Sequence, residues 1–198
     1  MPAPDGRTDR AQAEQAVRTL LAWIGDDPER ASLLATPGRV ARALAELGAG
    51  YREDPLGLLS SGLDEGVEGQ LVVVRDLTFH SLCEHHLLPF FGQVAIAYLP
   101  DGRLAGLSKL ARVVDAHARR LQVQERLTED IAKTLDQGLR PRGLAVVVAA
   151  EHLCMSMRGA AKPGHRIVTV ATRGTLAGDP AARAAALQLT GGADQCAP

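Results

Sequence analysis

Three side chains that can bind a metal ion lie close together in the segment SLCEHHLLPFFG, residues 81–92. Cys83 and His86 are three residues apart, a spacing that lets one turn present a thiolate and an imidazole to the same metal ion. His85 lies next to His86. The chain has only three cysteines and six histidines, so this local density indicates a metal site. Two ligands do not hold a zinc ion, and further ligands must come from elsewhere in the chain.

A second pair of metal-capable residues, His152 and Cys154, lies in a long apolar segment. We expect a strand over 143–157, in which side chains two positions apart point to the same face. Cys154 and the first pair would give three ligands and leave a position for water, the arrangement of a catalytic zinc. His85 and His152 then remain as acid–base groups beside that water. A closed structural site with His85 or His152 as its fourth ligand is also consistent with the spacing.

Basic residues near the expected helix ends form a second candidate group. Each alone is expected to be a solvated surface charge, but together with backbone N–H groups at helix starts they could bind a polyphosphate. Neither of the two common glycine-rich nucleotide-binding motifs occurs in the chain. These basic residues are Arg39, Lys109, Arg112 and Arg158.

Gln124 and Glu125 open an expected helix. The simpler interpretation of Glu125 is a negative charge that stabilises the positive end of the helix. The functional interpretation is a carboxylate that accepts two hydrogen bonds from a guanidine-like edge, such as that of guanine.

The elements that must position these residues are indicated by hydrophobic periodicity and turn residues. The segment 52–67 is rich in Gly, Ser, Pro and Asp and is expected to be a loop, and the alanine-rich segment after Gly178 is expected to be loose. Alternating helices and strands favour an α+β fold, in which helices cover one face of an antiparallel sheet. Helices are expected over 13–24, 36–51, 108–120 and 124–139, and strands over 70–79, 92–99, 143–157 and 165–174.

Length and composition are those of one soluble domain. At 198 residues the chain supports one core, with an N-terminal helical segment over 1–66, a catalytic part over 67–190 and a loose tail over 191–198. A net charge of −1 argues against a protein that coats nucleic acid. The odd cysteine count, with no signal peptide and no long apolar run, predicts a protein of the reducing cytoplasm that does not enter a membrane. Cys196 is expected to be a bystander.

Five sequence blocks together resemble the GTP cyclohydrolase I family. In chain order they are TPGRVA, SLCEHHLLPFFG, GLSKLAR, QVQERLT and HLCMSMRG, and the likeness extends from about residue 10 to about residue 190. The resemblance implies a zinc-dependent enzyme that converts GTP and water to 7,8-dihydroneopterin triphosphate and formate. Hydroxide attack at C8 opens the imidazole ring, the ribose rearranges and the ring recloses. This reaction is the first step of tetrahydrofolate and pterin biosynthesis.

The resemblance also implies a role for each candidate residue. His152 resembles the family's proton-transfer histidine near N7 and C8, and His85 the histidine that assists ring opening at the ribose side. Ser108 falls in the substrate-contacting GLSK block. The remaining roles are the zinc ligands Cys83, His86 and Cys154, the purine-anchoring Gln124 and Glu125, and the triphosphate-binding Arg39, Lys109, Arg112 and Arg158.

The resemblance further implies a tunnel fold (T-fold), in which antiparallel sheets of several subunits form a barrel with the helices outside. It implies a homodecamer of two pentameric rings with active sites at subunit interfaces and one zinc ion per subunit. The chain departs from its relatives at His165, where Ser or Thr is common, and at Leu176, near a common aromatic position. These departures concern subunit packing or the pocket rim.

Other functions stay open from the sequence. One is a related enzyme that stops after ring opening, although the presence of both His85 and His152 favours the full reaction. Another is a different tunnel-fold enzyme, such as a nitrile reductase or a pyruvoyl-pterin synthase, whose cysteine or three-histidine patterns are not found here. A third is a non-enzymatic zinc module, which would require a closed four-ligand site.

Overall fold

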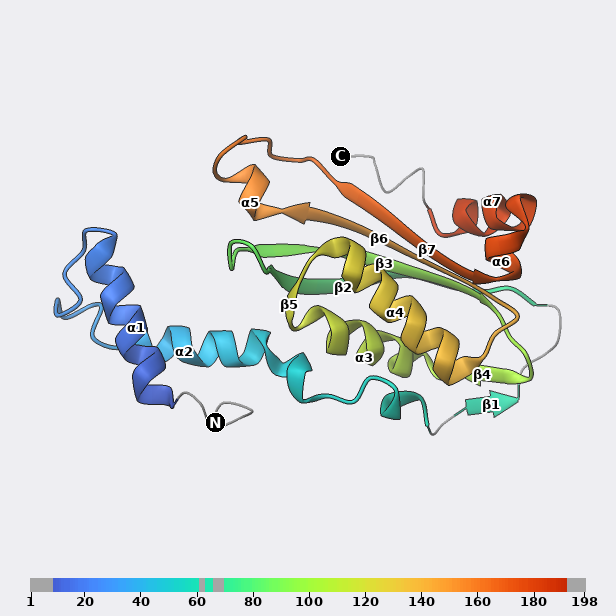
Figure 1. The fold of residues 1–198 in the computed structure, drawn as a ribbon, viewed down its shortest axis with the longest axis horizontal. Coiled ribbons are helices and arrows are strands. Elements are labelled where there is room, and N and C mark those ends of the chain that lie inside the picture. The colour runs from blue at the N-terminus through green and yellow to red at the C-terminus, as the bar shows by residue number, and fades with distance from the viewer. Residues whose placement is uncertain (1–8, 61–62, 66–69, 192–198) are drawn as a thin grey trace.

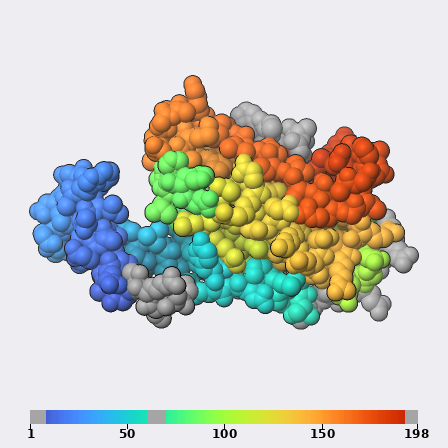
Figure 2. Space-filling view, in the orientation of Figure 1, coloured from blue at the N-terminus to red at the C-terminus, as the bar shows by residue number. Residues whose placement is uncertain are grey.

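The computed structural model describes residues 9–60, 63–65 and 70–191. Two helices open the chain and pack against each other, and Figures 1 and 2 show that they project from the body of the molecule. The first is capped by Asp9, whose side chain accepts a hydrogen bond from the backbone of Gln12. The expected helices of this region are confirmed. These elements are α1 (Arg10–Trp23), α2 (Thr36–Leu47) and the 3₁₀ turns η1 (Ala49–Arg52) and η2 (Gly57–Leu59).

A five-stranded sheet forms the body, in the order β5-β2-β3-β6-β7. Neighbouring strands are antiparallel except for the short parallel contact between β5 and β2. The predicted hairpin of the last two strands is therefore confirmed. The strands are β2 (Val72–Cys83), β3 (Pro89–Leu99), β5 (Leu121–Gln122), β6 (Gly143–His152) and β7 (Ile167–Gly174).

A second, two-stranded sheet corrects the expected loop over 52–67. Within that segment β1 (Leu63–Glu65) forms a strand, which pairs antiparallel with β4 (Arg103–Ala105). Local composition did not reveal β1, because its partner strand lies far along the chain.

Two long helices, α3 (Leu107–Ala118) and α4 (Gln124–Leu139), cover one face of the sheet. Their apolar sides form the core with alternate side chains of the strands, and Leu110, Leu127 and Val146 are fully buried there. The predicted fold class is confirmed: α+β, with a largely antiparallel sheet whose two long helices pack on one face. The tunnel-fold subunit that the resemblance implies has this arrangement.

The alanine-rich segment after Gly178 is not loose, which corrects the expectation. It forms α7 (Pro180–Leu189), preceded by the short α6 (Thr175–Gly178). The Asp179 side chain caps α7 by accepting hydrogen bonds from two backbone N–H groups, and Pro180 suits the first turn. Both helices pack on the opposite face of the sheet at one end, where Ala145 and Leu176 are buried. Three predictions lie outside the described residues: the frayed start over 1–8, the boundary near residue 66, and all but the first residue of the tail over 191–198, with Cys196.

Candidate functional site

The turn between β2 and β3 holds the first two predicted metal ligands. Cys83 is the last residue of β2 and is buried. Its carbonyl oxygen accepts hydrogen bonds from the backbone N–H groups of His86 and Leu87, and its own N–H donates to the Leu88 carbonyl. This tight turn brings His86 back over the strand end, so that Cys83 Sγ and His86 Nδ1 are 3.8 Å apart.

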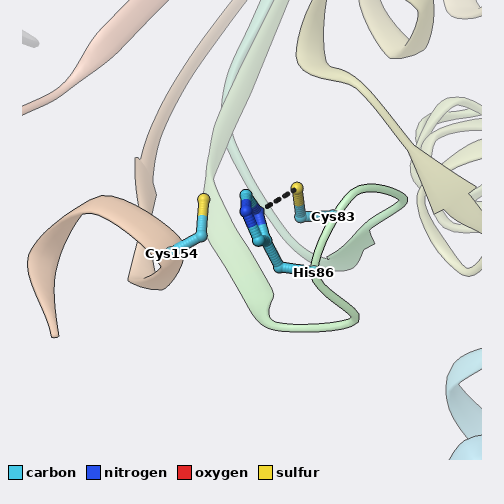
Figure 3. A group of neighbouring side chains, drawn as sticks. All are labelled: Cys83, His86 and Cys154. Atoms are coloured by element: carbon cyan, nitrogen blue, oxygen red, sulfur yellow. Dashed lines mark hydrogen bonds between the residues drawn. The ribbon is translucent and has the colours of Figure 1, made fainter. Parts of the chain in front are cut away.

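Cys154 reaches the same place by a route that the sequence did not predict. The strand expected over 143–157 ends at His152, and Leu153–Ser156 form the short helical turn α5. Strand alternation therefore does not place Cys154, and that argument was wrong. Its position follows from the register of β6 beside β3, which sets His152 opposite Phe90 just after the His86 turn. Figure 3 shows Cys154 projecting from α5 toward Cys83 and His86.

The three donor atoms suit a zinc ion. They all lie within 4.8 Å of one another. Tetrahedral zinc with its usual bond lengths requires donor separations of about 3.6–3.8 Å, which the Cys83–His86 pair already meets. Two sulfur atoms and one imidazole nitrogen form a donor set that zinc accepts and that magnesium or calcium does not. Burial and the adjacent Cys83 raise the pKa of the Cys154 thiol in the metal-free protein, so metal binding must release a proton.

Neither additional histidine belongs to this donor group among the described residues. The ring of His85 is exposed, and its Nε2 lies 3.9 Å from the Glu84 carboxylate. Glu84 pairs in turn with Arg126, which lowers the pKa of the Glu84 carboxyl. The donor group found among the described residues of one chain thus has three protein ligands, one fewer than the four of a closed structural site.

His152 is held rigidly at the end of β6. Its ring stacks on Phe90 with centroids 4.6 Å apart and planes 5° apart, and its Nε2 lies 2.9 Å from Gln124 Oε1. Burial lowers the pKa of His152, and nearby His165 lowers it further while Glu125 opposes the shift. A histidine with a lowered pKa is neutral at pH 7 and can accept a proton.

Gln124, which the resemblance assigns to the purine edge, is buried at the start of α4. Its side chain is 1% exposed and is engaged by hydrogen bonds inside the chain. Glu125, the next residue, is exposed at the start of α4, and its carboxylate affects the His152 ring electrostatically. Sequence reasoning missed the contacts of Gln124, Phe90 and Arg126, because a sequence carries no local signal for contacts between distant segments.

The remaining predicted residues do not join the metal ligands within one chain. Ser108, Lys109 and Arg112, here called the α3-start group, lie in the first turns of α3. That helix follows β4, which comes after the end of β3 that is distant from the metal ligands (Figure 1). The 11 residues of β3 carry the chain about 35 Å away from the metal ligands, and the α3-start group lies just beyond that far end. Even the whole of α3, with 12 residues, is only about 18 Å long and could cover about half of the way back.

Two further arginines are exposed. Arg39 lies on α2, which projects with α1 from the body, and Arg158 follows α5 beside the metal ligands. One chain thus presents the metal ligands, His152, Glu125 and Arg158 at one end of the sheet. The α3-start group lies elsewhere in the same chain.

Comparison with known proteins gives a consistent result over nearly the whole chain. The family model described as GTP cyclohydrolase I matches residues 13–191. The chain is 52% identical over 172 residues to GTP cyclohydrolase 1 of Brucella anthropi, covering 86% of this chain and 81% of that protein. It is 51% identical to the Bacillus subtilis protein of the same name, covering 91% and 95%. Its identity to the Streptomyces griseus protein of that name is 52%, covering 93% and 92%.

A solved structure, that of the archaeosine synthase QueF-Like in the apo form, is also similar. Its TM-score is 0.45 at 20% identity, covering 55% of this chain and 97% of that chain. No helix among the described residues is long and apolar enough to cross a membrane.

Proposed function

The chain belongs to the GTP cyclohydrolase I family, and we propose that it converts GTP and water to 7,8-dihydroneopterin triphosphate and formate at the site described above. The observation that carries the proposal is the convergence of Cys83, His86 and Cys154, whose ligand atoms lie within 4.8 Å of one another. A hydrolase of this family acts in pterin and folate biosynthesis, where this reaction is the first step.

The metal is proposed to be zinc, with one ion held in each chain by Cys83, His86 and Cys154. Bound there, zinc would lower the pKa of a water molecule to about 7 and so would supply hydroxide at neutral pH. C8 of GTP is a poor electrophile, and attack on it is aided by protonation at N7. The rigid ring of His152, next to the metal ligands, suits this proton transfer: the neutral ring would first take up the proton that the attacking water loses and then pass it to N7. His85, on the exposed turn, is proposed to assist opening at the ribose side.

Substrate binding divides between the base and the triphosphate. The exposed Glu125 carboxylate suits the guanine edge, which offers two donors to one carboxylate. Arg158 and Arg39 are proposed to bind phosphate oxygens together with Lys109 and Arg112. Ser108 is proposed to contact the same part of the substrate.

The separation of the α3-start group from the metal ligands supports a site shared between subunits. We propose that a neighbouring copy supplies Ser108, Lys109 and Arg112 to each metal centre. A ring of subunits meets this need, because a heterologous interface repeated around a ring closes every site in the same way. The proposed assembly is a decamer of two pentameric rings, and the proposed location is the cytoplasm.

The test is incubation of the purified, zinc-analysed protein with GTP. Formate release and the fluorescence of the oxidised pterin are followed together. Both products, with about one zinc ion per chain, support the proposed reaction. Formate without pterin would identify an enzyme that stops after ring opening. Neither product from zinc-loaded protein would contradict the proposal and favour a non-catalytic zinc module.

A further inference from the structure

Gln124 lies at the centre of a buried hydrogen-bond network that ends on His152. Its amide nitrogen lies 3.0 Å from the Val148 carbonyl oxygen, 2.8 Å from that of Ile167 and 3.1 Å from Thr169 Oγ1. Its amide oxygen lies 2.9 Å from His152 Nε2. The single side chain therefore ties the start of α4 to β6, to β7 and to the ring of the acid–base histidine.

The direction of each hydrogen bond follows from the groups that can only accept. The backbone carbonyl oxygens of Val148 and Ile167 are acceptors, so the Gln124 nitrogen faces them and its oxygen must face His152. The two backbone carbonyl groups therefore fix the orientation of the Gln124 amide. An amide oxygen can only accept, so His152 must carry its proton on Nε2 to complete the contact.

The hydroxyl groups of two threonines complete the network, and the donor in each of their hydrogen bonds can also be assigned. Thr128 Oγ1 donates to the backbone carbonyl oxygen of Gln124, at 2.8 Å, and this contact uses its only proton. In the 2.6 Å contact between the two hydroxyls, Thr169 must therefore be the donor and Thr128 the acceptor. Thr169 then accepts from the Gln124 nitrogen. The two N–H groups of that nitrogen serve three acceptors, so one N–H is shared between two of them.

Packing fixes the ring as firmly as the hydrogen bonds do. The His152 ring lies parallel to that of Phe90, which is fully buried. Rotation of the imidazole out of this plane would break the stacking, and a 180° flip of the ring would remove the contact between Nε2 and Gln124. Nδ1 is therefore the His152 nitrogen left with a lone pair in the neutral ring.

We propose that Gln124 is a positioning residue, which holds the His152 ring by its Nε2–H and leaves Nδ1 as the nitrogen available to the substrate. Its side chain then does not read the guanine edge, and that task falls to Glu125. This inference rests on the proposed function for the identity of the substrate, but the tautomer itself is a property of the protein without GTP.

The first test measures the tautomer directly. The zinc-loaded, assembled protein is labelled with ¹⁵N-histidine, and ring nitrogen shifts are recorded without GTP. The His152 signals are those that disappear in a His152→Gln variant. A protonated Nε2 with a bare Nδ1 supports the proposal, and a protonated Nδ1 overturns it. This result does not depend on activity, so it stands even if the proposed function fails.

The second test separates positioning from substrate contact by steady-state kinetics. In Gln124→Met, which keeps the side-chain volume, kcat should fall about 10- to 100-fold, while the KM for GTP changes less than about twofold. The matched Glu125→Gln variant should instead raise the KM for GTP. It should also reduce the preference for GTP over inosine triphosphate, which lacks the 2-amino group. A raised KM and a lost base preference in Gln124→Met would overturn the proposal.

A milder variant covers the case in which Gln124→Met does not fold. Thr169→Val removes one acceptor of the Gln124 amide but leaves the Val148 and Ile167 carbonyls in place. It should lower kcat by less than tenfold, with the KM for GTP unchanged and the Nε2–H tautomer retained. A larger effect on KM than on kcat in this variant would contradict a positioning role for the network.

Discussion

The metal-ligand group and the α3-start group differ in how completely one chain builds them. Cys83, His86 and Cys154 come together through one tight turn and one strand register, and their ligand atoms already lie within zinc-binding reach. The start of α3, with Ser108 and Arg112, is exposed on another part of the same chain. The fold of one chain brings the metal ligands together by itself, whereas the α3-start group can join a metal centre only if, as proposed above, a second copy supplies it.

The largest expected effect is at the metal group. Cys154→Ala removes one of three ligands, so zinc per chain should fall well below one and activity should drop more than about 1,000-fold. Metal analysis and formate release measure the two quantities on the same sample. Cys196→Ala, in the remaining cysteine of the chain, is the control and should retain both. Full activity in metal-depleted Cys154→Ala would show that the reaction does not need the metal ligands.

Removal of the neighbouring acid–base group should cost less and leave the metal in place. In His152→Gln, kcat should fall about 100- to 10,000-fold, the usual range for loss of a positioned acid–base group, while zinc per chain stays at the wild-type value. The pair of measurements distinguishes acid–base catalysis from ligation. Loss of zinc in His152→Gln would identify His152 as a fourth ligand and restore the closed-site alternative.

At the other end of the comparison, loss of one cation should weaken binding without affecting chemistry. A charge-assisted hydrogen bond contributes about 1.5–3 kcal/mol, so Arg112→Ala should raise the KM for GTP about 10- to 150-fold. Its kcat and zinc content should stay close to wild type. Arg103→Ala, a change at a basic residue of nearby β4, is the matched control and should leave KM unchanged. A zinc deficit in Arg112→Ala would show that the two regions are not independent.

The smallest effect on the reaction is expected from a change at His117, a buried histidine of α3, which should alter the pH dependence of stability. Burial lowers the pKa of His117 from 6.5 to about 4, and Arg120 adds repulsion while Asp130 opposes the shift. The unfolded chain therefore binds a proton that the folded chain excludes. The contribution of neutral His117 to the free energy of unfolding is complete above about pH 6.5 and is lost as the pH falls toward 4. At pH 4.5 the loss is about 2–3 kcal/mol.

His117→Gln tests this pH dependence. Its thermal midpoint should fall less than that of wild type between pH 7 and pH 4.5, at equal protein concentration. Metal release in acid affects both proteins alike, so the difference between them isolates His117. Equal falls would show that α3 does not respond to acid through this residue.

Sequence reasoning succeeded where the signal was local. The helix over 124–139 was predicted to the residue, because a regular apolar period follows a suitable start. The three predicted metal ligands do lie together. The strand from which Cys154 was predicted ends earlier, because no local pattern distinguishes a strand end from the turn α5. The helix α7 could have been found from Asp179 and Pro180, a cap and a first-turn residue.

The misses share one physical cause. The strand β1 depends on pairing with β4, and the role of Gln124 depends on carbonyl groups of two other strands. Such contacts are decided by packing between distant segments, which local propensity does not encode. The separation of Lys109 from Cys83 belongs to the same class, because only the path of the chain through β3 and α3 reveals it.

Complementation between inactive subunits tests the central claim most directly. A Cys154→Ala chain and a Lys109→Ala/Arg112→Ala chain are co-expressed, and the mixed assemblies are assayed at a GTP concentration where each parent is inactive. If metal ligands and cations of one site come from different chains, about a quarter of the sites in a random mixture are intact. Activity should recover in proportion. Co-assembly of Cys154→Ala with His86→Ala, two defects in one metal group, should recover none. No recovery in the first mixture, with assembly intact, would contradict the shared site.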